Sequence, residues 1–237
     1  DVVRRIGALP GLKSLGLDAE GNIWTPRGSW RWADSSEAPR SLGDVEPEFT
    51  TQPVVLGGKT IAFIKSHYGN PQKARGPVID SSGWAHLEAR GLGNLKLSKT
   101  AYGSAAFTNS KGQLRLLVTE PDGKALDFPI SENGDIGDRP DEVQLPGLTR
   151  CSSLAWFDGN ILAADRGALV ILRETAQGAW ETTKRLEGFG EEIFVHSDGR
   201  SFVVSDAKNG RVSLYNALDT SAAIASYGGL DSPEKVA

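Results

Sequence analysis

A short phrase recurs five times along the chain: a glycine that follows an acidic, polar or small residue and precedes a hydrophobic strand. The turn glycines are spaced roughly 40 to 50 residues apart, at Gly21, Gly58, Gly112, Gly159 and Gly199. A period of this length is typical of propeller blades rather than of helical or leucine-rich repeats. The repeat therefore predicts an all-β propeller, and it leaves the function open.

The strands within a repeat alternate apolar and polar residues and are separated by turn residues. In the fifth repeat, residues 201–206 and 211–215 are expected to form a hairpin. Its turn contains Asn209 and Gly210, a pair that favours the positive φ angles of a type I′ turn. The fourth repeat predicts strands at 161–164, 168–173 and around 180–185, with a turn at 165–167. Three or four such strands make one blade.

The chain is interpreted as one propeller domain, residues 1–237, because repeats continue on both sides of its two polar stretches. Those stretches, 33–48 and 131–144, are expected to be long loops. The ring is expected to have six blades, with the last completed by missing residues or by an amino-terminal strand at 2–6. The expected blades are 7–50, 51–98, 99–145, 146–187 and 188–228, with the start of a further one at 229–237.

Composition excludes several partners. The net charge of −4 comes from 26 basic and 30 acidic residues that are interspersed, so no basic stripe predicts nucleic-acid binding. No apolar run approaches the roughly 20 residues of a membrane span. The chain begins at Asp1 without a leader or an initiator Met, which favours a mature secreted or periplasmic product, or an excised piece. The single Cys151 cannot form an intrachain disulfide, and we expect it to be a packing residue rather than a nucleophile.

The last hairpin resembles the NHL repeat. Ser197-Asp198-Gly199, Asp206 and the run Asn209-Gly210-Arg211-Val212 all match its consensus, and residues 15–24 and 154–165 match its first half. Such motifs are similar to those of NHL propellers and of the related gluconolactonase, or senescence-marker, superfamily. The resemblance implies a six-bladed β-propeller, and it specifies architecture far better than activity.

In the resembled superfamily, the residue five positions before the repeat's aspartate faces the mouth of the central channel. Counting from Asp18, and allowing a one-residue shorter turn in two repeats, gives six candidate ligand-binding residues. These are Lys13, Thr51, Ser104, Ser152, Glu191 and Glu234. If the ring closes, Glu191, Glu234 and Lys13 would belong to three consecutive blades. Two carboxylates and an ammonium group would then lie near one another at the mouth.

Such a cluster predicts either a divalent-cation site, such as calcium on Glu191 and Glu234, or a site for a polar ligand. The resemblance implies a lactonase metal held by a Glu, Asn residues and an Asp. Lys13 stands where that Glu is expected and Ser152 where an Asn is expected, and both departures argue against lactonase activity. A channel that is simply lined by solvated polar residues is the simpler alternative.

The histidines and tryptophans add two weaker hypotheses. Some NHL propellers are lyases that hold zinc with histidines, but His67 and His86 fall in one blade and His196 in another, which argues against a ring of ligands. We expect these to be turn or surface residues. Trp24 is expected in the core, whereas Trp30 and Trp32 share one strand face and could stack on sugar rings.

The sequence thus favours a rigid platform that binds a small polar or carbohydrate-like ligand or a protein segment. A metal-dependent hydrolase or lyase with its site at the channel mouth is the alternative. A structural propeller module within a larger chain is a third.

Overall fold

The computed structural model describes the chain fully at residues 103–120, 122–132, 137, 139–218 and 223–230, and describes the backbone of seven earlier strands. The first sheet contains β1 (Gly16–Leu17), β2 (Asn22–Thr25) and β3 (Gly28–Arg31). The second contains β4 (Val54–Val55), β5 (Thr60–Ala62), β6 (Pro77–Asp80) and β7 (His86–Glu88). All described elements are strands, which confirms the all-β prediction.

Three four-stranded sheets follow with side chains described. The third contains β8 (Gly103–Thr108), β9 (Leu114–Thr119), β10 (Lys124–Pro129) and β11 (Asp141–Gln144). The fourth contains β12 (Cys151–Phe157), β13 (Asn160–Asp165), β14 (Ala168–Glu174) and β15 (Trp180–Leu186). The fifth contains β16 (Ile193–Ser197), β17 (Phe202–Asp206), β18 (Arg211–Tyr215) and β19 (Ala225–Tyr227).

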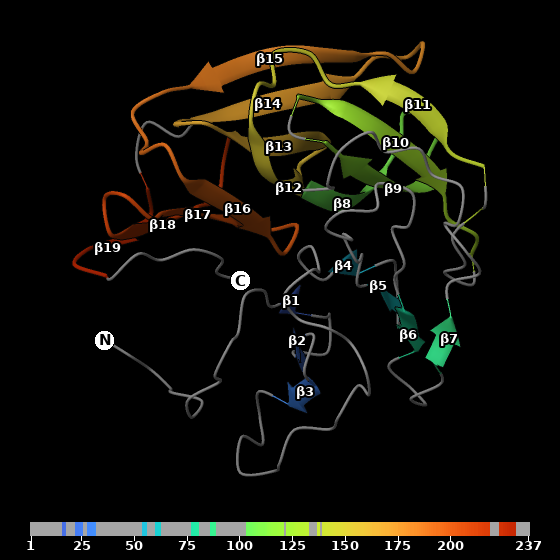
Figure 1. Cartoon of the computed structure of the whole chain (residues 1–237), viewed down its shortest axis with the longest axis horizontal. Coiled ribbons are helices and arrows are strands. Elements are labelled where there is room, and N and C mark those ends of the chain that lie inside the picture. The colour runs from blue at the N-terminus through green and yellow to red at the C-terminus, as the bar shows by residue number, and fades with distance from the viewer. Residues whose placement is uncertain are drawn as a thin grey trace, which may run out of the picture.

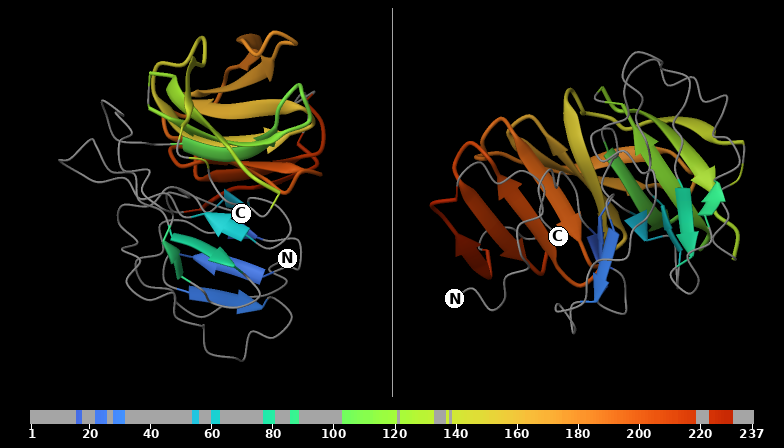
Figure 2. Two further views of the ribbon diagram at one scale, coloured as in Figure 1. Left: turned by 90° about the vertical axis from the view of Figure 1, so that its right-hand side faces the viewer. Right: turned by 60° about the horizontal axis from the view of Figure 1, so that its bottom comes forward.

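Every sheet is an antiparallel meander in which each strand pairs with the next along the chain. The first strands, β1, β4, β8, β12 and β16, lie toward the middle of the molecule, and the last strands lie outside, as Figure 1 shows. The five sheets follow one another around the middle in chain order, and Figure 2 shows them from two further sides. This is the arrangement of propeller blades, in which consecutive sheets pack face to face.

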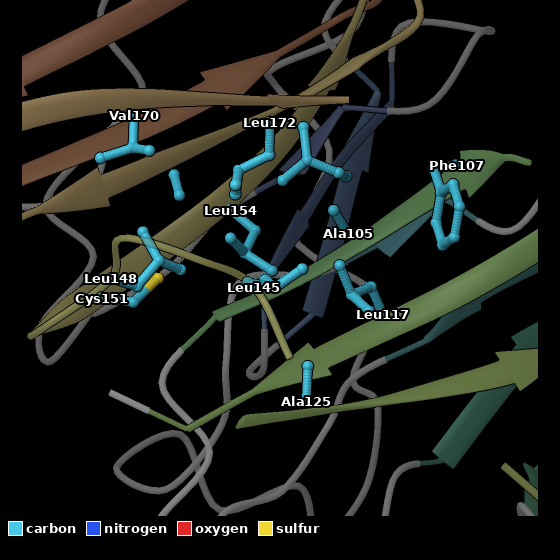
Figure 3. Close-up of a cluster of buried hydrophobic side chains, with 12 residues drawn as sticks. Ala105, Phe107, Leu117, Ala125, Leu145, Leu148, Cys151, Leu154, Val170 and Leu172 are labelled. Atoms are coloured by element: carbon cyan, nitrogen blue, oxygen red, sulfur yellow. The ribbon is translucent and has the colours of Figure 1, made fainter. Parts of the chain in front are cut away.

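Apolar side chains fill the space between consecutive blades. Between the third and fourth sheets, Ala105, Phe107 and Leu117 meet Leu154 and Leu172, and Figure 3 shows these side chains pointing toward one another. The ring of Phe107 lies between Trp156 and Trp180, with centroid distances of 5.7 and 5.4 Å. Both tryptophans are half-buried and pack against this cluster, so they stabilise the contact between the two blades.

A second cluster joins the fourth and fifth sheets. Phe202 is fully buried, and its ring packs edge-on against Phe157 at 5.0 Å and is stacked on Tyr215 at 5.1 Å. Ile193 and Val195, on the first strand of the fifth sheet, belong to the same cluster. The fourth sheet therefore buries one face against the third sheet and the other face against the fifth.

Turn chemistry differs from the sequence prediction at one hairpin. The predicted strands at 201–206 and 211–215 and the four-residue turn between them are found, because Asp206 pairs with Arg211, but the turn does not have the predicted type I′ geometry. Gly210 has a φ of +57°, and Asn209 is not among the residues with positive φ. Pairs of positive φ angles occur instead at Asp158–Gly159 (47° and 74°) and Arg166–Gly167 (27° and 80°).

Two other expectations change. The stretch 131–144 was expected to be a loop, but its last four residues form β11, because they pair with β10 from Gln144 to Asp141. The stretch 33–48 and Trp32 lie outside the described residues, as do residues 2–6 and 231–237 of the terminal segments expected to complete the ring. No helix in the described part of the chain is long and apolar enough to span a membrane.

Candidate functional site

Three of the six predicted mouth residues lie in the described structure. Ser104 is buried on β8 with 4% of its surface exposed, Ser152 is half-buried on β12, and Glu191 is exposed just before β16. All three lie at or just before the beginning of the first strand of a sheet. These are the strand ends that the count from Asp18 points to. Lys13, Thr51 and Glu234 lie outside the described residues.

The two serines of β12 connect neighbouring blades. The Ser152 hydroxyl lies within donating distance of the carbonyl oxygens of Ala164 (3.2 Å) and Ile193 (2.5 Å). The hydroxyl oxygen of Ser153 accepts a hydrogen bond from the Val195 amide at 2.8 Å. These bonds hold the first strand of the fifth blade against the first strand of the fourth.

Three buried acidic residues lie at this same end, of which the sequence pattern had marked only Asp206, as part of the NHL-like consensus. They stand at or directly after the end of a second strand, before the turn to the third: Glu120, Asp165 and Asp206, all at most 1% exposed. Their signal in the sequence is an acidic residue at the end of each apolar run, as in the segments 116–120, 161–165 and 202–206. A buried carboxylate is stable only when it is paired or hydrogen-bonded, so its partners reveal its role.

Asp165 holds the segment that leads into β12. Its carboxylate accepts hydrogen bonds from the backbone amides of Thr149 (2.8 Å) and Arg150 (2.5 Å). It also forms an ion pair with the Arg185 guanidinium at 3.1 Å, and Arg185 in turn contacts the exposed Glu187. One buried carboxylate therefore ties the interblade connection to both the second and fourth strands of its blade.

Asp206 has the same role one blade later. Its carboxylate accepts hydrogen bonds from the Gly190 amide at 3.0 Å and from the side-chain amide of Asn209 at 2.7 Å. The Ala207 amide donates to the carbonyl oxygen of Glu192 at 3.0 Å. The loop before β16 is thereby fixed on both sides of Glu191.

Glu191 and Glu192 are both exposed and precede β16 rather than lying in it. Because β16 begins only at Ile193, the alternation of a strand does not direct the two side chains to opposite faces. A rigid loop at the beginning of an innermost strand presents two carboxylates to solvent.

Cys151 is buried beneath the connection that Asp165 holds. Burial, together with the negative charge of Asp165, raises the pKa of its thiol well above the usual range. Its Sγ lies 3.5 Å from the carbonyl oxygen of Ser153. A nucleophilic cysteine needs a lowered pKa and access to substrate, and the structure gives Cys151 neither.

His196 lies within β16, where it pairs with Val203, and so it is not the turn residue that the sequence predicted. The ring is half-buried, and burial lowers the pKa of His196 to about 4 from 6.5, although the charge of Asp198 opposes this. The backbone of His86 lies in β7, and His67 lies outside the described residues. Within the described ranges, no group of three or more His, Cys, Asp or Glu residues is arranged to hold a metal ion.

His196 predicts a pH dependence of stability. In the unfolded chain the imidazole of His196 takes up a proton as the pH falls through 6.5. In the folded chain it takes up that proton only when the pH falls to about 4. The free energy of unfolding should therefore decrease as the pH falls from 6.5 to 4, by up to about 2–3 kcal/mol from this group. Urea unfolding of the wild type and of His196→Gln across this range measures the difference. Parallel pH profiles for the two proteins would contradict the assignment.

The opposite end of the third and fourth blades carries a separate ionic cluster. Arg115 donates from Nε to the Asp127 carboxylate at 2.8 Å and from Nη2 to that of Asp141 at 2.7 Å. Burial outweighs the attraction of Arg115 and raises the pKa of Asp127. The Ser110 amide donates to the Glu174 carboxylate at 2.6 Å, which joins the two blades. The two ion pairs of Arg115 therefore stabilise the third sheet itself, and the bond to Glu174 connects that sheet to the fourth.

Comparisons with known proteins support the fold. No protein-family model matches the chain, and no curated protein sequence matches it. A chain from the crystal structure of a nidogen–laminin complex is similar with a TM-score of 0.64, at 16% identity over 95% of this chain and 83% of that one. A functionally unknown protein from Desulfotomaculum acetoxidans is similar with a TM-score of 0.62, at 12% identity over 91% of this chain and 69% of that one.

Virginiamycin B lyase from Staphylococcus aureus is also similar, with a TM-score of 0.54 at 11% identity over 94% of this chain and 72% of the lyase chain. These structures are β-propellers or closely related folds. Together with the radial, antiparallel sheets, they show that this chain has a β-propeller fold.

Proposed function

We propose that the chain is a six-bladed, NHL-like propeller that acts as a rigid binding platform, with a small polar or carbohydrate-like ligand at its mouth. The observation that carries this proposal is the fixed, solvent-facing loop of Glu191 and Glu192. On one side of Glu191 the Gly190 amide donates to the Asp206 carboxylate, and on the other side the carbonyl oxygen of Glu192 accepts from the Ala207 amide. Because the loop is already ordered, a ligand that binds there loses little free energy to ordering the protein.

The chemistry of the loop fits ligands with several hydroxyl or ammonium groups. Carboxylates accept hydrogen bonds from such donors, and these charge-assisted bonds are stronger than neutral ones. In this proposal Lys13, Thr51, Ser104, Ser152 and Glu234 complete the ring of polar residues around the channel. Ser152 contributes by positioning, because its hydroxyl contacts the carbonyl oxygen of Ile193, two residues beyond Glu191.

Glu191→Ala should weaken ligand binding at least about tenfold, a loss typical of one charge-assisted hydrogen bond, while the thermal midpoint stays unchanged. Glu191 is exposed, so its removal leaves no buried group without a partner. Calorimetric titration with a panel of mono- and oligosaccharides measures the effect. Glu181→Ala, which removes an equally charged exposed side chain from the outer strand β15, is the matched control. Equal affinities for the two variants would refute the role of Glu191.

A metal-dependent hydrolase or lyase is the second candidate, favoured by the similarity to virginiamycin B lyase and by the carboxylates of the mouth loop. Carboxylate oxygens are the ligands that calcium prefers. Elemental analysis after dialysis separates the two candidates. A stoichiometric divalent ion that is lost in Glu191→Ala or Glu234→Ala favours the enzyme, and a metal-free protein with unchanged stability favours the platform. The propeller seen in the nidogen–laminin complex makes a protein segment a further ligand to include in the binding panel.

A further inference from the structure

The turn between β13 and β14 has a residue at its first position that the backbone there disfavours. Asp165 pairs with Ala168, so Arg166 and Gly167 alone form the turn. Their φ angles are +27° and +80°, both in the left-handed region. Two-residue turns of this kind favour Asn, Asp or Gly, because other L-residues are strained at positive φ. The conformation of the turn therefore does not explain why an arginine stands at position 166.

A second turn in the same blade shows the contrast. Asp158 is the other non-glycine residue with a positive φ in the described part of the chain, and the Asp158–Gly159 turn has angles of +47° and +74°. The short polar side chain of an aspartate tolerates this conformation. Of these two turns, the one at the mouth carries the residue that opposes its own backbone. Such conflicts between local preference and structure concentrate at functional sites.

Side-chain contacts do not compensate for the strain at Arg166. Its side chain is exposed, and among the described residues its guanidinium has no ion pair or hydrogen bond. Arg115 and Arg185, by contrast, each pair with a buried carboxylate. A guanidinium without a partner offers a planar set of N–H donors that matches the oxygens of a carboxylate or a phosphate. The Arg166 guanidinium is thus available to a ligand.

The turn of Arg166 lies against the loop that leads to Glu191. The Phe189 amide donates a hydrogen bond to the carbonyl oxygen of Gly167 at 3.3 Å, which joins the two segments. The mouth therefore presents a guanidinium on one loop and the carboxylates of Glu191 and Glu192 on the next, all of them exposed. A ligand that satisfies both loops carries an oxyanion for the first and hydroxyl groups for the second.

We infer that Arg166 is a specificity-determining residue of the mouth, and that its guanidinium binds a carboxylate or phosphate group of a carbohydrate-like ligand. The inference rests on the proposed function, because it narrows the ligand to acidic sugars and sugar phosphates. A guanidinium pairs with such an oxyanion through two parallel hydrogen bonds, so it selects the ligand by geometry as well as by charge. The strained turn places the cation where this contact needs it.

Arg166→Asn tests the strain. Asparagine is favoured at a positive φ, so the thermal midpoint should rise by about 2–4 °C. A midpoint that stays the same or falls would show that the arginine costs the fold nothing, and would overturn the inference. Arg200→Asn is the matched control. It removes an equal charge from an exposed position in the turn between β16 and β17, at the opposite end of the fifth blade, and should leave the midpoint unchanged.

Titration with glucose, glucuronic acid and glucose 6-phosphate tests the ligand class. The three probes share one sugar and differ in carrying no oxyanion, a carboxylate or a phosphate. One of the two acidic probes should bind at least about tenfold more tightly than glucose and shift the Nε–H signal of Arg166. That advantage should disappear in Arg166→Asn and persist in Arg200→Asn. The acidic probe with the larger advantage identifies which oxyanion the site takes.

The outcomes separate this inference from the proposed function. If glucose shifts the amide signals of residues 189–193 and neither acidic probe binds more tightly, the role of Arg166 is overturned and the platform stands. An acidic advantage that survives in Arg166→Asn overturns it too. An acidic probe that shifts residues 166–168 and keeps its affinity in Glu191→Ala supports Arg166 and contradicts the proposed role of Glu191. If none of the probes shifts either segment, both proposals fail.

Discussion

Replacing Asp165 with alanine should lower the free energy of unfolding by about 3–5 kcal/mol, the range for breaking a buried ion pair from one side. The carboxylate is completely buried, and it holds two backbone amides and the Arg185 guanidinium. Its loss leaves these donors without an acceptor in the connection between the third and fourth blades. Urea unfolding followed by tryptophan fluorescence measures the change.

Asp141→Ala is the matched control for Asp165→Ala. Asp141 also forms an ion pair with an arginine, at 2.7 Å, but its side chain is 75% exposed. Exposed pairs contribute at most about 1 kcal/mol, so this variant should unfold close to the wild type. If both variants lose the same stability, the buried acidic residues are not what holds the interblade connections.

Phe202→Ala should cost a similar amount, about 3–5 kcal/mol, because it removes a large buried ring and leaves a cavity. The ring lies between Phe157 of the fourth blade and Tyr215 of its own blade. The loss should therefore loosen the contact between two blades as well as the interior of one. Hydrogen exchange should speed up on both sides of this contact, in β13 and in β17.

Phe202→Leu is the companion variant, since it keeps most of the apolar volume and should lose less than half as much stability as Phe202→Ala. A faster exchange confined to β17 in Phe202→Ala would contradict the interblade role of this ring. In that case the fourth and fifth sheets would behave as independent units rather than as packed blades.

The sequence predicted the blades well because strand periodicity and turn glycines are local signals. The strands at 161–173 and 201–215 were found where alternation and glycine placed them. Turn type was harder. The Asn209–Gly210 pair favours the two positive φ angles of a type I′ turn, but Asn209 is not among the residues with positive φ, and its backbone and side-chain amides donate to Asp206 instead. Local propensity does not report these contacts.

The candidate site was predicted only in part. A count from the repeat aspartate found Ser104, Ser152 and Glu191 at the beginnings of innermost strands, but it could not show what each side chain contacts. The repeated carboxylates of Asp165 and Asp206 were visible as the last residues of apolar runs. Several of their partners lie 15 to 20 residues away, in the connection that enters the blade and in its outer strand. That separation explains why the sequence pattern placed Asp165 in a turn and Asp206 at a strand end without indicating what either carboxylate holds.

In the proposed function, ligands bind at the mouth, where the loop before β16 is fixed. The most direct test is a map of amide chemical-shift changes as the labelled protein is titrated with calcium and with a panel of oligosaccharides. We predict changes centred on residues 149–153 and 189–193, abolished by Glu191→Ala and retained in Glu181→Ala. Changes centred on the opposite end of the blades, at residues 109–113 and 174–180, or no change with any member of the panel, would contradict the claim.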